Sequence, residues 1–323
     1  MNINSLAFKY TLSKKFIHHN IGLKLLIFFV ALNIPIAYAV ATTLKNQPAI
    51  FSLSNLENLS REELVTKLAK QEIVILGEVH DNLVHHQIHG QLINEINLAM
   101  KVSGKSKKDK IAVTIIVEHL PAGSKVEFDS KLDQALNNSG FNPKAWNWPI
   151  HEPLFSAIGV SGLALRGGSL SMSDGREMFS SGGASSPAHL KRLIEQSTLS
   201  DSSQKLLFKE IQDGHCGLFP ENKIPQMAQV QRARDTSLAY EAVAYAPSIL
   251  IVGNGHAWND IGVPQIIRAN YANRSIASVL FIEDGGISDP QKLLLKAKNL
   301  ATKADYVWFT STAHRADPCE KLR

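Results

Sequence analysis

Several apolar runs along the chain have the pattern of buried β-strands. Each run is rich in β-branched or aromatic residues, and strands of this kind are typical of a parallel sheet that is covered on both faces. Polar and glycine-containing segments bound the runs, as expected where strands end. The runs cover Glu72–Leu76, Ala112–Val117, Ser248–Val252, Ala277–Ile282 and Tyr306–Phe309.

Between these runs, apolar residues recur every three or four positions, which predicts amphipathic helices. The alternation of strands with helices indicates an α/β fold with a largely parallel central sheet flanked by helices. The segment at about 141–220 has helical patterns but no comparable strand, so we predict a mostly helical insertion there. Helices are expected at 53–70, 83–100, 124–136, 153–158, 188–197, 202–213 and 224–246.

The first 39 residues have the pattern of a signal peptide. They contain four lysines and no acidic residue, and an apolar stretch then ends on the small-x-small sequence Ala37-Tyr38-Ala39. An uncleaved anchor is the alternative, but the apolar stretch is shorter than the roughly 20 residues of a spanning helix. We expect cleavage near Ala39, a periplasmic protein without a lipobox cysteine, and a single domain over 40–323.

Charge and cysteine content refine this prediction. The net charge of +5 includes the four leader lysines, so the mature chain is close to neutral and nothing indicates nucleic-acid binding. Cys216 and Cys319 are the only cysteines, and an exported protein can oxidise them to a disulfide. Two free thiols are the alternative; we predict the bridge.

Polar residues follow three of the predicted strands. Glu78 and His80 come after the first, Glu118 after the second, and His256 after the third. The carboxyl ends of parallel strands meet at one edge of a sheet, where ligands gather. Glutamate and histidine act as metal ligands or as acid–base groups. The pattern therefore predicts one shared polar site.

Two further groups lie on predicted helices. The first turns of the helix predicted at 83–100 carry His85, His86 and His89. We interpret these as surface or internally hydrogen-bonded histidines, with only His86 supporting the site. Arg234 and Asp235 interrupt an alanine-rich helix. Arg234 suits a carboxylate or a haem propionate, and a surface pair with Asp235 is the alternative.

Missing motifs narrow the chemistry. The sequence has no H-E-x-x-H pair of the zincin type and no C-x-x-C-H for covalent haem. Because C-x-x-C-H is missing, any haem would be held non-covalently. The glycines before His256 lack the third glycine of a dinucleotide loop, which makes a dinucleotide site a weak interpretation.

Taken in order, these motifs resemble the ChaN-type haem-binding uptake family of the Tiki superfamily. The resemblance spans residue 73 to the C-terminus, and one departure is His89, which stands where a glutamine is expected. The matching segments are Leu76–Asn82, His85–His86, Val117–Glu118, Cys216–Pro220, Gln231–Asp235, Gly253–Ala257 and Asp317–Cys319.

The resemblance implies an exported protein that binds haem in haem or iron uptake. It also implies outer-membrane haem uptake machinery as a partner and is compatible with a homodimer. The iron ligand is a histidine or a tyrosine, and the sequence does not rank Tyr240, Tyr245 and Tyr271. The expected haem-binding residues are Glu78, His80, His86, Glu118, Arg234, Asp235 and His256.

Other branches of the superfamily imply an alternative function. This is a metal-dependent esterase or peptidase with a divalent ion held by Glu78, His80, Glu118 and His256. A third interpretation is a scaffold whose polar cluster is a buried hydrogen-bond network. The sequence leaves open whether the protein is an enzyme.

Overall fold

The computed structural model of the chain describes residues 49–102, 112–183, 185–317 and 319–320. The chain divides into two units, 1–47 and 48–323, and every described residue lies in the second. The predicted signal peptide lies outside the described residues. No helix of the described part is both long and apolar enough to cross a membrane.

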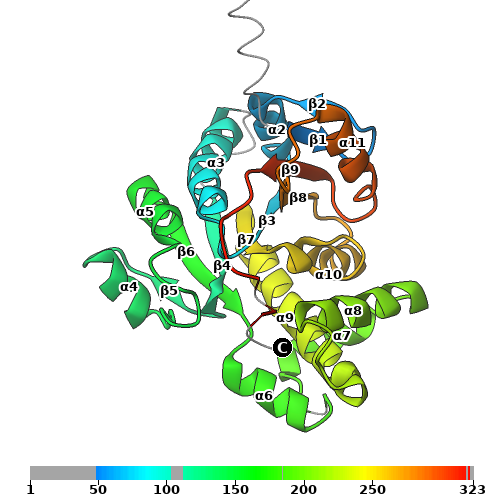
Figure 1. Cartoon of the computed structure of the whole chain (residues 1–323). Helices are drawn as coiled ribbons and strands as arrows, with labels where there is room; N and C mark the ends of the chain where they lie inside the picture. Colours follow the sequence, from blue (N-terminus) through cyan, green and yellow to red (C-terminus); the bar gives the residue numbers. More distant parts are fainter. Residues whose placement is uncertain (1–48, 103–111, 184, 318, 321–323) are drawn as a thin grey trace, which may run out of the picture. The chain divides into compact units, whose positions relative to one another are not determined.

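The described strands form one sheet with the order β2-β1-β9-β8-β3-β7-β4-β6-β5 (Figure 1). The central strands from β9 to β6 are parallel, and β1, β2 and β5 pair antiparallel at the two edges. This confirms the predicted fold class. The strands are β1 (Ala49–Ser52), β2 (Asn58–Leu59), β3 (Ile73–Glu78), β4 (Thr114–Pro121), β5 (Lys125–Val126), β6 (Ala164–Ser169), β7 (Ser248–Gly253), β8 (Ile276–Glu283) and β9 (Tyr306–Thr310).

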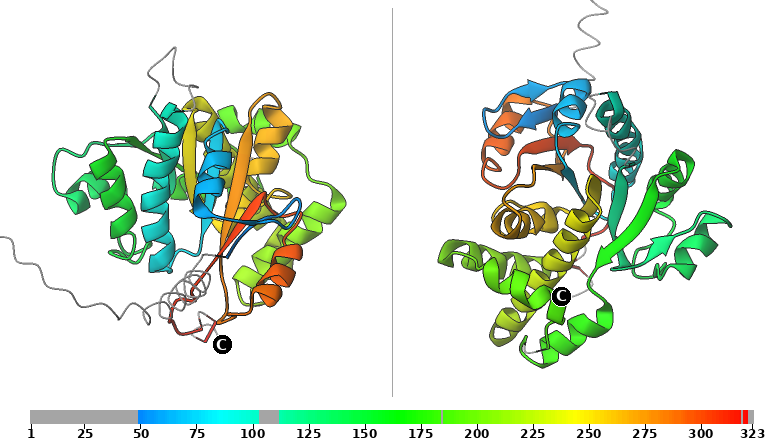
Figure 2. Two further views of the ribbon diagram at one scale, coloured as in Figure 1. Left: turned by 90° about the horizontal axis from the view of Figure 1, so that it is seen from above. Right: turned by 180° about the vertical axis from the view of Figure 1, so that it is seen from behind.

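Helices cover both faces of this sheet (Figures 1 and 2). Helices α2, α3 and α5 pack on one face, and α9, α10 and α11 pack on the other. The helices are α2 (Arg61–Leu68), α3 (Leu83–Val102), α4 (Leu132–Asn138), α5 (Glu152–Ser161), α6 (Met172–Ser180), α7 (Ala188–Gln196), α8 (Asp201–Gly214), α9 (Ile224–Ala244), α10 (Val263–Asn270) and α11 (Pro290–Lys298), with single 3₁₀ turns η1 (Glu221–Lys223) and η2 (Asn254–Ala257).

The alternation of side chains along each strand builds two apolar cores. In β3, Val74 and Leu76 belong to the core under α3 and α5, whereas Ile73 and Ile75 belong to the core under α9. All four side chains are fully buried. Successive strand residues point to opposite faces, so continuous apolar runs are what a sheet covered on both faces requires.

The region 167–186 is rich in glycine and serine, and it lies in the segment for which the sequence predicts helices but no strand. It contains the end of β6 and the whole of α6, and β6 pairs with β4 inside the sheet. The glycines of β6 permit a close approach of backbones: a Cβ on Gly167 would lie 2.2 Å from the carbonyl oxygen of Pro121. Close approach, rather than flexibility, explains this glycine.

The C-terminal segment after β9 runs past the carboxyl ends of the strands (Figure 1). Asn82 donates a hydrogen bond to the carbonyl of Ser311, and Arg315 pairs with Asp81 and Glu283. A disulfide between Cys319 and Cys216 then joins the segment to the turn after α8. The predicted bridge is therefore present.

Candidate functional site

Three neighbouring strands bring the predicted polar residues to one edge of the sheet. Glu78 ends β3, Glu118 lies near the end of β4, and His256 lies in η2 directly after β7. β7 runs between β3 and β4, and the backbone N–H of Gly253 donates to Glu118 Oε2 over 2.8 Å. Gly77 is part of β3, and a Cβ there would lie 2.5 Å from the Asn254 side chain.

The strand alternation divides these residues between the two faces. Glu78 continues the Val74 and Leu76 side, which faces α3 and α5. Glu118 continues the Ile116 side, which faces α9. The edge therefore carries two polar groups, one on each side of the sheet.

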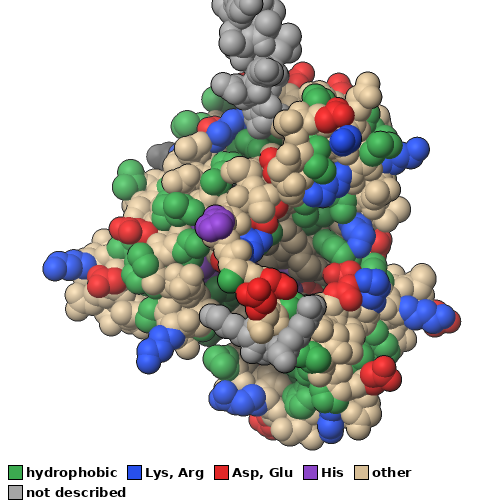
Figure 3. Space-filling view, viewed as in Figure 1, with side chains coloured by type: hydrophobic (Ala, Val, Ile, Leu, Met, Phe, Trp, Pro, Cys, Tyr) green, Lys and Arg blue, Asp and Glu red, His purple; other side chains and the backbone are tan. Residues whose placement is uncertain are grey.

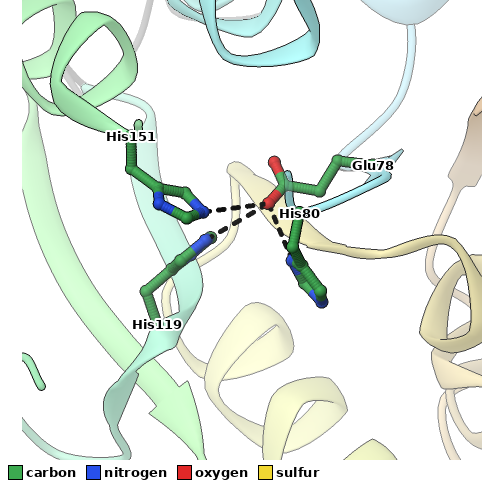
Figure 4. Close-up of side chains that lie close together, drawn as sticks. All are labelled: Glu78, His80, His119 and His151. Atoms are coloured by element: carbon green, nitrogen blue, oxygen red, sulfur yellow. Dashed lines mark hydrogen bonds and ion pairs between the residues drawn. The ribbon is translucent and has the colours of Figure 1, made fainter. Parts of the chain in front are cut away.

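The first group, which we name the histidine cluster, surrounds the buried carboxylate of Glu78 (Figure 4). Oε1 lies 3.0 Å from His80 Nδ1, 3.2 Å from His119 Nε2 and 3.9 Å from His151 Nε2. Oε2 lies 3.4 Å from His86 Nδ1 and 3.3 Å from His89 Nδ1. The cluster consists of Glu78, His80, His86, His89, His119 and His151.

The residues of the cluster come from four parts of the chain. Glu78 and His80 belong to the β3 end, His86 and His89 to α3, His119 to β4, and His151 caps α5. Apart from His80, whose side chain is 40% exposed, all are buried. The exposed edge of His80 is therefore the part of the cluster that meets solvent.

The imidazoles stabilise the charged form of Glu78. Burial by itself raises the pKa of this carboxyl, but hydrogen bonds from the surrounding histidines, His119 first, outweigh burial and hold the pKa well below its usual value. Burial also lowers the pKa of His89 and of His151. The cluster thus combines one carboxylate with imidazoles that stay neutral at these two positions.

Several nitrogen atoms of the histidine cluster have no partner in the described chain apart from the Glu78 carboxylate. His89, His119 and His151 each face Glu78 with one ring nitrogen, and the other ring nitrogen is buried without a partner in the described chain. Buried polar atoms are hydrogen-bonded in most proteins, and an unpartnered one costs about 1–3 kcal/mol. The cluster therefore has an unused capacity to bind a ligand.

The second group, which we name the carboxylate set, consists of Glu118, Asp235, His256 and Gln231. His256 lies between two carboxylates, with Nδ1 2.6 Å from Asp235 Oδ1 and Nε2 3.2 Å from Glu118 Oε1. Gln231 Nε2 lies 3.1 Å from His256 Nδ1. Burial lowers the pKa of His256, but the charges of Glu118 and Asp235 outweigh it and raise the pKa to about 10. The two carboxylates therefore favour the protonated form of His256.

His80 joins the two groups. Its Nδ1 faces Glu78, and its Nε2 lies 3.8 Å from Glu118 Oε2. The rings of Trp146 and His119 lie against the same imidazole, with centroids 5.0 and 5.9 Å away. Burial lowers the pKa of His80, but the charges of Glu118 and Glu78 outweigh it and raise the pKa.

Arg234 lies on α9 one turn after Gln231 and next to Asp235. It is half-buried, and among the described residues it has no hydrogen-bond or ion-pair partner. Asp235 pairs with His256 instead, so the structure does not contain the Arg–Asp pair that the sequence left as an alternative. On the face shown in Figure 3, a hollow is bordered by acidic and basic side chains.

The neighbouring histidines divide between structure and site. His85 accepts a hydrogen bond from the Val79 N–H and contacts Thr310 Oγ1 over 2.7 Å, so it is internally hydrogen-bonded as expected. His86 lies against Glu78, in the supporting position predicted for it. His89 was wrongly grouped with the surface or satisfied histidines, because it is buried with Nδ1 3.3 Å from Glu78 Oε2 and with Nε2 lacking a partner in the described chain.

Sequence reasoning missed His119 and His151. The signal for His119 was available, since it shares strand parity with Ile115 and Val117 and therefore the face of Glu78. His151 precedes α5 in a segment without periodicity, and only the packing of α5 on α3 brings it to Glu78. No pattern in the sequence predicts that contact.

Comparisons with known proteins support a family assignment. The model of the haem-binding uptake family ChaN, Tiki superfamily, matches residues 64–267. The structure is similar to ChaN of Campylobacter jejuni, described with cofacial heme binding, at a TM-score of 0.61 and 21% identity over 81% of this chain and 96% of that one. At this identity the structural similarity shows the fold alone.

Two weaker similarities carry no functional argument. The type III effector HopBA1 matches with a TM-score of 0.36 and 15% identity over 78% of this chain and 93% of its own. A Bacillus cereus protein matches with a TM-score of 0.37 and 10% identity over 86% and 99% of the two chains. No curated protein sequence matches this chain significantly.

Proposed function

The chain belongs to the haem-binding uptake family ChaN of the Tiki superfamily, and on this basis we propose that it is an exported protein that binds haem non-covalently for haem or iron uptake. Family membership supports haem as the ligand. The main structural support for this site is that Arg234 is a half-buried cation without a partner in the described chain. It lies on the helix that also supplies Gln231 and Asp235.

Haem presents an apolar ring system, an iron that needs a ligand, and two anionic propionates. A guanidinium can hold a carboxylate through two parallel hydrogen bonds. The half-exposed His80 and the ring of Trp146 beside it offer an imidazole and an apolar surface at the same edge of the sheet. In this proposal Arg234 orients the haem, and the bound haem supplies the iron centre.

The tyrosines lie in a different part of the structure. Tyr240 lies in the second half of α9 and Tyr245 caps its C-terminus, and they are 39% and 37% exposed. Along the helix axis, Tyr240 is about 7.5 Å and Tyr245 about 15 Å from Asp235. His80 lies at the strand ends themselves, and this placement favours it as the candidate iron ligand over the two tyrosines.

A hemin titration followed by absorption tests this proposal. The Arg234→Ala variant is expected to bind hemin about tenfold more weakly or worse, because a hydrogen bond to a charged group contributes about 1.5–3 kcal/mol. His80→Ala is expected to change the absorption spectrum of the complex. Tyr240→Phe is the matched control and is expected to behave like the wild type.

Two results would contradict the proposal. If the wild-type protein shows no saturable hemin binding, haem binding is not its function. If the Arg234 and His80 variants bind hemin like the wild type and Tyr240→Phe loses hemin affinity, the haem site does not lie at the strand ends.

Export and partners are part of the same proposal. The Cys216–Cys319 disulfide is consistent with an oxidising compartment, and the leader sequence predicts a mature chain that begins near Val40. Outer-membrane haem uptake machinery and a homodimer remain predicted partners. N-terminal sequencing of the secreted protein and its mass in solution with and without hemin test these points.

The alternative hydrolase keeps one supporting observation. The Nε2 atoms of His80 and His256 both face Glu118, at 3.8 and 3.2 Å, and a carboxylate lies at the other nitrogen of each ring. Histidine ligands of metals are commonly oriented in this way. Metal-dependent, saturable ester or peptide hydrolysis without hemin binding would favour this function over haem binding.

A further inference from the structure

The histidine cluster carries an inference that does not depend on haem. We propose that Glu78, His119 and His151, together with Nδ1 of His80, hold one non-haem divalent transition-metal ion. The ion lies on the α3 and α5 side of the sheet, whereas the carboxylate set and Arg234 lie on the α9 side. This site differs from the predicted metal site, which combined Glu78 and His80 with Glu118 and His256.

The distances around Glu78 fit a small coordination shell. The four ligand atoms all lie within 4.8 Å of one another. A tetrahedral zinc ion with bonds of about 2.0–2.1 Å has ligand atoms about 3.3 Å apart. The separations from Glu78 Oε1, which are 3.0, 3.2 and 3.9 Å, bracket that value. Figure 4 shows the three imidazoles grouped around this oxygen.

The state of the ring nitrogens distinguishes this group from the carboxylate set. His119 and His151 each face Glu78 with Nε2, and Nδ1 of both rings is buried without a partner in the described chain. By contrast, Glu118 accepts from Gly253, and His256 is held between Glu118 and Asp235. Ring nitrogens that lack hydrogen bonds in the described chain are therefore concentrated where the ion is proposed.

The orientation of His86 points in the same direction. Its Nε2 lies 2.9 Å from the carbonyl oxygen of His80, so Nε2 carries a proton and donates it. Its Nδ1 faces the carboxylate of Glu78 at 3.4 Å. A ring held in this way supports the carboxylate, as the hydrogen-bonded partners of metal ligands commonly do.

The ligand types indicate the class of metal. Imidazoles with one carboxylate suit zinc, copper, nickel, cobalt or iron, whereas magnesium and calcium prefer oxygen ligands alone. Haem does not compete for this position, because Glu78, His119 and His151 are at most 3% exposed. His89 Nδ1, 3.3 Å from Glu78 Oε2, is placed to orient the carboxylate from behind.

Elemental analysis with zinc as the probe tests the proposal. The full-length mature protein is stripped with a chelator, equilibrated with Zn²⁺ and dialysed, and haem iron is counted separately from its absorption. We expect one zinc per chain. His119→Gln and His151→Gln should each weaken zinc binding by more than the 10–100-fold that is typical of losing a partner of a metal ligand.

Matched variants locate the ion. His256→Gln, in the carboxylate set, and His314→Gln, an exposed histidine, should retain one zinc per chain. Retention in His119→Gln and His151→Gln with loss in His256→Gln would place the ion at Glu118 and overturn the proposal. Less than stoichiometric zinc in the wild type would also overturn it.

A spectroscopic measurement on the wild type avoids variants that fail to fold. X-ray absorption of the zinc-loaded protein is expected to show three imidazoles and one oxygen ligand. Two or fewer imidazoles would contradict the proposed ligand set. Haem binding enters neither measurement, so a failed hemin titration and a failed zinc experiment remain distinguishable.

Discussion

At the scale of single residues, the role of each histidine depends on the hydrogen-bond partners of its two ring nitrogens. His85 uses both nitrogens inside the fold, through the Val79 N–H and Thr310 Oγ1. His80 turns Nδ1 to Glu78 and keeps Nε2 toward Glu118. The same residue type therefore supports the fold at one position and connects the two polar groups at another.

The buried His85 predicts how stability depends on pH. Burial lowers the pKa of His85 from 6.5 to about 3. As the pH falls from 6.5 toward 3, the unfolded chain binds a proton here that the folded chain does not. The free energy of unfolding should fall by about 1.4 kcal/mol per pH unit from this group.

Denaturant unfolding of the metal-free protein at several pH values measures this effect. In His85→Gln, the slope of the unfolding free energy against pH should decrease by the equivalent of about one proton. The variant should also be about 1–3 kcal/mol less stable at neutral pH, because the Val79 N–H loses its acceptor. His314→Gln is the control with an exposed histidine. Equal slopes in wild type and His85→Gln would contradict this account.

Residue patterns predicted one part of the site better than the other. Strand ends gave Glu78, His80, Glu118 and His256, because the position after a parallel strand follows from periodicity. His89 was missed because a helix pattern does not show which histidine lies against a buried carboxylate. His151 was missed because its place depends on the packing of α5 against α3.

At the scale of elements, the close pairing of β7 with β3 and β4 positions His80. A Cβ added to Gly253 would lie 2.7 Å from His80 Nε2 and 3.6 Å from Glu118 Oε2. The glycine at the end of β7 therefore leaves room for the imidazole that joins the two polar groups.

Gly253→Ala should displace His80 and weaken binding of both hemin and zinc, with little loss of stability because His80 is half-exposed. Isothermal titration with each ligand measures the effect. Gly255→Ala is a matched control, since a Cβ there meets nothing within 4 Å in the described structure. Wild-type affinities in Gly253→Ala would show that this contact does not position the site.

Periodicity predicted the central elements and failed where glycine or short length hides it. The strands β3, β7 and β8 and the helices α3 and α9 were expected from their apolar repeats. β6 was missed because two glycines in its six residues lower its strand signal, although close backbone packing requires at least Gly167. The short α10 and α11 were not predicted either.

At the scale of the whole molecule, the disulfide anchors the C-terminal segment that passes the strand ends. It closes a loop with a sequence separation of 103 residues between Cys216 and Cys319. Arg315 adds ion pairs with Asp81 and Glu283 near the start of α3. The disulfide therefore holds the far end of the segment, and Arg315 holds its middle.

Cys319→Ser should lower the free energy of unfolding by up to about 4.7 kcal/mol, because a cross-link of this length restricts the unfolded chain. Denaturant unfolding with and without reductant measures the loss. Reductant should destabilise the wild type and leave Cys319→Ser unchanged. An equal response of both proteins would show that the bridge does not contribute.

The position of haem is the central claim, and an iron anomalous difference map from crystals of the hemin complex tests it most directly. Our account predicts an iron peak at the carboxyl ends of β3, β4 and β7, on the exposed side of His80, with a propionate at Arg234. An iron peak beside Tyr240 or Tyr245, or away from the strand ends, would contradict it.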